Sequence, residues 1–169
     1  MTVSDSVRRL NRRVGIIAVA LAICGSATAL AGQSTGRPSP RVVFVCEHGA
    51  AKSVVATAYF NKIAAERGLP YRATFRGTSP QADLSVSALK GLREDGVEIP
   101  VGKPAAISAE DVGAATHIFA IGCTLPAQAQ TSGKASDWSD VPDDKGYAPM
   151  RDAIRRHVEL LLGELTKRR

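Results

Sequence analysis

Residues 41–53 constrain the fold more than any other part of this 169-residue chain. Arg41 is followed by the unbroken apolar run Val42-Val43-Phe44-Val45, which is typical of a strand buried on both faces of a parallel sheet. Residues 46–52 contain a glycine and several small residues, which indicates a tight loop. A helical pattern then runs from Ser53 to Arg67, and Gly68 ends it. A strand, a short loop and a helix in this order form the opening of an α/β unit.

The same alternation continues to the end of the chain. Residues 71–75 and 117–121 have strand patterns, and a fourth strand is expected near Trp138. Helical patterns cover 85–95 and 150–165, and Ser108 with Asp111 predicts another helix start. The sequence therefore predicts a three-layer α/β fold, with a four-stranded parallel sheet covered by helices on both faces. Aromatic residues make up only 5% of the chain, so we expect a core of mainly Ala, Val, Leu and Ile.

The first 31 residues have the pattern of a secretory signal peptide. Paired arginines at 8–9 and 12–13 precede the apolar run 14–31, which ends in the small-x-small cleavage pattern Ala29-Leu30-Ala31. We expect cleavage near Ala31, export to the periplasm or the medium, and no stable membrane insertion afterwards. An uncleaved N-terminal membrane anchor is the alternative. Residues 32–40 are rich in Gly, Ser and Pro and form a linker, which leaves 41–169 as the single domain.

Charge and metal-ligand patterns narrow the function. Residues 1–31 carry +3 of the formal net charge of +6, which leaves only +3 for the remaining chain. This ordinary surface charge argues against nucleic-acid binding. No spacing of His, Cys and carboxylates predicts a metal site, and we expect no cofactor. His117 and His157 are expected to be structural, whereas His48 lies in the 46–52 loop and either contacts substrate or faces solvent.

The loop that follows the first strand has the residues for binding and attacking an oxyanion. Ligands of parallel sheets bind at the carboxyl ends of the strands, which is where Cys46 stands. Loop amides and the following helix N-terminus can cradle an anion, and the same field favours the thiolate of Cys46. Lys52 adds a positive charge, and Ser53 offers a hydroxyl to the thiolate. A small buried cysteine at a strand end is the alternative reading.

Several segments resemble one protein family in the same order. Residues 42–53, VVFVCEHGAAKS, resemble the C-x5-R-S loop of the low-molecular-weight protein tyrosine phosphatases and the related arsenate reductases. Similar matches occur at 77–80, 89–97, 122–124, 137–143 and 151–154, so the resemblance spans about 130 residues. Three departures stand out. Lys52 replaces the family's arginine, Gly49 replaces its usual asparagine, and the acid candidate Asp143 precedes Asp144 instead of proline.

The resemblance implies a cysteine-dependent phosphatase that hydrolyses a phosphomonoester, with phosphotyrosine among the candidates. Cys46 would form a cysteinyl-phosphate, and Lys52 would stabilise the negative charge of the phosphoryl group. Asp143 would act as general acid, with Asp140 and Asp144 as rivals. The phosphate-binding loop would comprise Glu47, His48, Gly49, Ala50, Ala51, Lys52 and Ser53.

Two other functions remain open at this point. Cys123 would allow arsenate reduction, in which Cys123 attacks Cys46 and leaves a disulfide. Lys52 and Gly49 would instead suit an oxyanion-binding protein with weak catalysis. The expected partner is therefore a phosphorylated substrate or an oxyanion such as phosphate or arsenate. We expect the substitution Lys52→Arg to raise aryl phosphate turnover, because a guanidinium can bind two phosphate oxygens at once. A fall would instead indicate a loop reshaped around a shorter cation.

Overall fold

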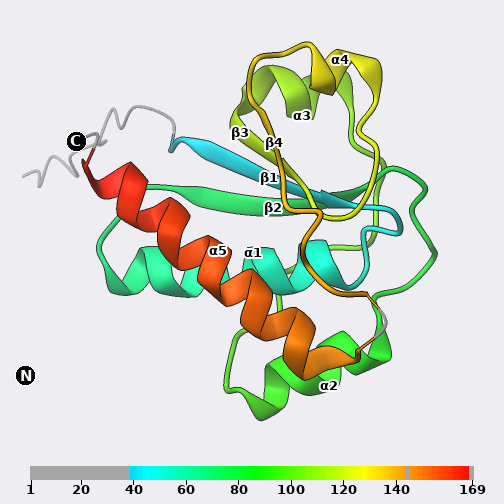
Figure 1. Ribbon diagram of the computed structural model, residues 1–169, viewed down its shortest axis with the longest axis vertical. Coiled ribbons are helices and arrows are strands. Elements are labelled where there is room, and N and C mark those ends of the chain that lie inside the picture. Colours follow the sequence, from blue (N-terminus) through cyan, green and yellow to red (C-terminus); the bar gives the residue numbers. More distant parts are fainter. Residues whose placement is uncertain (1–38, 144, 168–169) are drawn as a thin grey trace, which may run out of the picture. The chain divides into compact units, whose positions relative to one another are not determined.

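Four parallel strands form one sheet in the order β2-β1-β3-β4 (Figure 1). The computed structural model describes residues 39–143 and 145–167. The predicted signal peptide and most of the predicted linker lie outside these described residues. The strands are β1 (Arg41–Cys46), β2 (Arg72–Gly77), β3 (Ala115–Ala120) and β4 (Ala135–Asp137).

Helices cover both faces of this sheet. Figure 1 shows α1, α2 and α5 on one face and α3 and α4 on the other. The helices are α1 (Lys52–Glu66), α2 (Val86–Glu94), α3 (Ala109–Ala114), α4 (Ala127–Gln130) and α5 (Tyr147–Lys167). The predicted three-layer α/β fold with a four-stranded parallel sheet is therefore confirmed. None of the helices among the described residues is long and apolar enough to cross a membrane.

The central strand β1 explains why its sequence is apolar without alternation. Val42 and Phe44 belong to a buried cluster with residues of α1, α2 and α5. Val43 and Val45 belong to a second buried cluster on the other face, with residues of α3, β3 and α4. A strand with both faces buried has no position for a polar side chain, so an unbroken apolar run is expected.

Element boundaries differ from the prediction where strand pairing extends an element. Cys46 was expected just past the first strand, but it is the last residue of β1 and pairs with Gly77. Gly77 lies beyond the predicted strand 71–75, yet it is the last residue of β2 for the same reason. The four-residue α4 was not predicted, since so short a helix carries little periodicity. Ser108 caps α3 in the predicted capping box with Asp111.

Candidate active site

The loop between β1 and α1 is held in place through its carbonyl groups and not through its amides. Glu47 O accepts from Ser79 N at 2.8 Å, and Ala50 O accepts from Ser85 N at 3.0 Å. His48 O similarly accepts from the backbone of the 78–85 segment. Within the part of the chain that the structure describes, the amides of residues 47–53 donate no hydrogen bond to a protein group. Such a row of unpaired amides at a helix start is a site for an anion.

The thiol of Cys46 lies at this loop and is almost fully buried, at 3% exposure. Its Sγ is 3.2 Å from Ser53 Oγ, a side chain that the first turn of α1 buries completely. A hydroxyl at this distance can donate a hydrogen bond to a thiolate and stabilise it. The predicted contact between Cys46 and Ser53 is therefore present.

Lys52 begins α1 and places a nearly buried ammonium in the site. Its Nζ donates to Asp143 Oδ2 at 2.8 Å, and the Lys52 and Asp143 side chains are 8% and 77% exposed. A Cβ added to Gly122 would stand only 2.8 Å from the same Nζ. Gly122 has a φ of +61°, so both its backbone and its missing side chain suit glycine. The loop after β3 thus makes room for the ammonium.

A pair of glycines shapes the loop itself. Gly49 has a φ of +62°, and a Cβ there would lie 2.8 Å from the backbone nitrogen of Gly77. A Cβ at Gly77 would in turn lie 2.8 Å from the nitrogen of Gly49. Neither backbone can move aside as a flexible side chain would. The loop therefore excludes an asparagine at 49 by close backbone contact with the end of β2.

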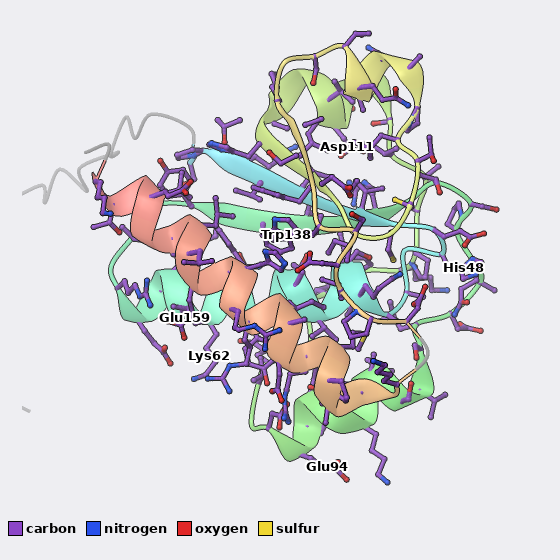
Figure 2. All side chains as sticks on the ribbon, in the orientation of Figure 1. His48, Lys62, Glu94, Asp111, Trp138 and Glu159 are labelled. Atoms are coloured by element: carbon purple, nitrogen blue, oxygen red, sulfur yellow. The ribbon has the colours of Figure 1, made fainter. Side chains whose placement is uncertain are left out.

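Cys46, Lys52 and Asp143 line a cavity of about 330 Å³. Figure 2 shows His48 beyond the carboxyl end of β1, on the loop that leads to α1. Five of the seven predicted loop residues line the cavity, whereas Gly49 and Ser53 do not. The lining consists of Cys46, Glu47, His48, Ala50, Ala51, Lys52, Gln81, Ser85 and Asp143.

Sequence reasoning missed Gln81 and Ser85, which come from the segment before α2. Their backbone amides bind the loop carbonyls, which brings both residues to the cavity. The only sequence signal was the predicted helix over 85–95, and the Ser85 side chain accepts from Ala88 N at its start. Nothing in that pattern indicates proximity to Cys46.

The structure separates the three acid candidates. Asp143 lines the cavity and binds Lys52. Asp140 does not line the cavity, and its Oδ1 lies 2.8 Å from His157 Nε2. Asp144 lies outside the described residues. Trp138 stacks on His157 and contacts Phe119, and Figure 2 shows it between the sheet and α5, so it packs in the core.

Cys123 lies near Cys46 but opens onto a different cavity. Its Sγ lies 3.5 Å from the carbonyl oxygen of Val45, the residue before Cys46. It lines a cavity of about 590 Å³ beside β4, not the one around Cys46. Burial raises the pKa of the Cys123 thiol above its usual value, and a hydrogen bond with the Ile121 backbone and the charge of Lys52 only partly oppose this. Both cysteines are free thiols in this structure.

Among the described residues, no group of three or more His, Cys, Asp or Glu side chains could hold a metal ion.

Comparison with known proteins gives matches at the level of structure. No protein-family model matches the sequence, and no curated protein matches it. YfkJ from Bacillus subtilis matches with a TM-score of 0.68 and 21% identity, over 79% of this chain and 99% of that one. A low-molecular-weight protein tyrosine phosphatase from T. tengcongensis matches with a TM-score of 0.66 and 20% identity, over 75% and 99%.

A reductase matches equally well. The thioredoxin-dependent arsenate reductase of Corynebacterium glutamicum has a TM-score of 0.67 and 22% identity, over 79% of this chain and 65% of that longer one. Phosphatases and arsenate reductases thus share this arrangement of strands and helices. The described chain has the fold of the low-molecular-weight protein tyrosine phosphatases and arsenate reductases.

Proposed function

We propose that this protein is a cysteine-dependent phosphatase that hydrolyses phosphomonoesters through a cysteinyl-phosphate. One observation carries the proposal: the Cys46 thiol lies against Ser53 in a cavity whose loop amides are unpaired. Seven successive amides can bind the oxygens of a phosphoryl group while charge spreads over them in the transition state. An arsenate reductase with this fold has been solved in a phosphate-binding state, which agrees with an oxyanion ligand.

The residues that line the cavity supply the chemical groups for each step of hydrolysis. The Cys46 thiolate attacks phosphorus, the bond from phosphorus to the leaving oxygen breaks, and Asp143 gives that oxygen a proton. Water then attacks the cysteinyl-phosphate, the sulfur–phosphorus bond breaks, and Asp143 takes the proton from water. Lys52 holds the negative charge throughout both steps.

The cavity lining supports phosphomonoesters with small or polar leaving groups. Its described residues are alanines, the nucleophile and polar side chains, with no aromatic side chain among them. A phosphotyrosine ring would therefore lack the aromatic partner that usually stabilises a bound ring. Glu47, His48 and Gln81 instead offer hydrogen bonds to a polar group.

Arsenate reduction is the second candidate, and the place of Cys123 favours it. Cys46 would attack arsenic and expel a hydroxyl as water. The Cys123 thiolate would then attack Cys46 Sγ, arsenic would keep the electron pair and leave as arsenite, and a disulfide would remain. An external dithiol would have to reduce that disulfide. Because Cys123 opens onto a separate cavity, residues 122–124 would have to move first.

One assay separates these reactions. The parent chain and the variant Cys46→Ser are each incubated with an aryl phosphate, with arsenate or with phosphate. Every sample is measured before and after thiol reduction. Turnover that requires reduced Cys46 supports the phosphatase. Loss of two thiols only when arsenate is present supports the reductase. Saturable phosphate binding without either reaction would replace both proposals with a non-catalytic oxyanion binder.

We also propose that the protein is exported and cleaved near Ala31. This proposal rests on the N-terminal sequence pattern alone, and those residues lie outside the described part of the chain. Export would remove the protein from the cytosolic thiol supply, which favours hydrolysis over reduction. N-terminal sequencing of the protein from cell fractions tests it, and an intact N-terminus on cytosolic protein would refute it.

A further inference from the structure

The cation of the candidate active site is bound to a carboxylate of the same site. Lys52 Nζ and Asp143 Oδ2 are 2.8 Å apart, and both residues line the cavity that contains Cys46. The contact joins residues 91 positions apart, so loop docking and not helix geometry brings them together. Glu47 and His48 are the other titratable groups that line the cavity.

This contact conflicts with the role that hydrolysis gives to Asp143. While Asp143 Oδ2 accepts a hydrogen bond from the Lys52 ammonium, that oxygen is engaged and is not available to a leaving group. The leaving oxygen nevertheless needs a proton from Asp143. The Lys52–Asp143 ion pair therefore has to open before or during substrate binding.

The exposure of the two side chains favours Asp143 as the partner that moves. Lys52 is 8% exposed and packs against Gly122, whereas Asp143 is 77% exposed. Ion pairs with an exposed partner are weak, and removing one changes an equilibrium by a factor of about 1.5 to 5. An incoming dianion with several oxygens competes easily with a single carboxylate for Lys52.

We infer that a substrate oxyanion displaces Asp143 from Lys52. During this exchange Asp143 takes up the proton that it later donates as the general acid. Once displaced, the Asp143 carboxylate faces a bound dianion instead of an ammonium, and a like charge favours its protonated form. The acid thus becomes competent only when substrate is present. This inference rests on the proposed phosphatase function and adds the order of events in the site.

The test measures binding of inorganic sulfate, which stays a dianion, to the full chain by calorimetry at about pH 5.5. Two buffers with different ionisation enthalpies report the protons taken up on binding. The chain is compared with Asp143→Asn, which is nearly the same size but cannot be an anion. Asp140→Asn is the matched control, because Asp140 is a similarly exposed carboxylate that binds His157 outside the cavity.

We expect Asp143→Asn to bind sulfate about two- to fivefold more tightly than the parent and to lose part of the proton uptake. Cys46, Glu47, His48 and Lys52 are all present in this variant, so the uptake that is lost is uptake that requires the Asp143 carboxylate. The same variant should lower both kcat and KM for an aryl phosphate. The control should behave as the parent does in every measurement.

Each outcome has a separate meaning. If the parent binds sulfate but Asp143→Asn binds it no more tightly and keeps the full proton uptake, the exchange is wrong and the phosphatase proposal stands. If the parent binds neither sulfate nor phosphate, the proposed function fails and the exchange fails with it. If Asp140→Asn reproduces the effects of Asp143→Asn, the cause is a general loss of negative charge.

Discussion

Adding one methyl group at Gly122 should disable the site while leaving the fold intact. The Cβ of Gly122→Ala would stand 2.8 Å from Lys52 Nζ, whereas ordinary contact begins near 3.4 Å. The ammonium would therefore have to move by about 0.6 Å, and it can do so because it is the end of a flexible side chain. Losing its charged hydrogen bond in the transition state corresponds to about 1.5–3 kcal/mol.

That free energy predicts a fall in kcat/KM for an aryl phosphate of about 10- to 100-fold. Alanine at a φ of +61° also lowers the free energy of unfolding, by about 1–2 kcal/mol. Gly68 has the same φ of +61°, and a Cβ there would meet no atom within 4 Å. Gly68→Ala is therefore the matched control, with the same backbone strain and no contact with Lys52.

The assay pairs initial rates of aryl phosphate hydrolysis with urea unfolding of the parent and both variants. We expect similar losses in the free energy of unfolding but loss of turnover only in Gly122→Ala. Full activity in Gly122→Ala, or an equal fall in the activity of Gly68→Ala, would refute the claim that Gly122 sets the position of the ammonium.

Three other changes test separate parts of the structure. The sequence predicted a gain in turnover for Lys52→Arg, but Gly122 leaves no room for even a Cβ beside the Lys52 ammonium, so we now expect arginine to overfill the site and lower kcat about tenfold in the same assay; a gain would show a damaged phosphatase arginine. Gly49→Ala should lower the free energy of unfolding by about 2–4 kcal/mol in urea, because its Cβ meets backbone at a positive φ; a loss below 1 kcal/mol would show that the loop yields. Burial alone would raise the pKa of Asp111, but hydrogen bonds from Arg76 and Ser108 outweigh it and hold that pKa below its usual value. The charged form then stabilises the fold above the unfolded pKa of about 3.8, and this stability is lost as the pH falls further. Unfolding at pH 6 and pH 3 should therefore show a smaller acid-induced loss in Asp111→Asn than in the parent; an equal loss would place the acid sensitivity elsewhere.

The candidate nucleophile and its immediate support could be predicted because they are local. Cys46, Lys52 and Ser53 lie within eight residues at a strand-to-helix connection, and short-range geometry already brings them to one anion site. The capping box at Ser108 is similarly local and was predicted from its spacing. Predicted boundaries failed at Cys46 and Gly77, where pairing between two strands decides how far each extends.

By itself, the sequence determined the order of strands and helices and the parallel sheet, because hydrophobic periodicity is a property of neighbouring residues. It also determined that a cysteine thiol stands at a loop whose backbone amides can bind an anion. Only the tertiary structure decided which carboxylate meets Lys52, since Asp143 and Asp140 lie in the same short segment yet bind partners on different elements.

The tertiary structure likewise decided that Gly49 packs on Gly77, that Gly122 admits the Lys52 ammonium, and that Cys123 opens onto its own cavity. Each of these contacts joins segments far apart in the chain. Their distances depend on how loops dock on a finished sheet, and no local pattern of residues encodes that docking.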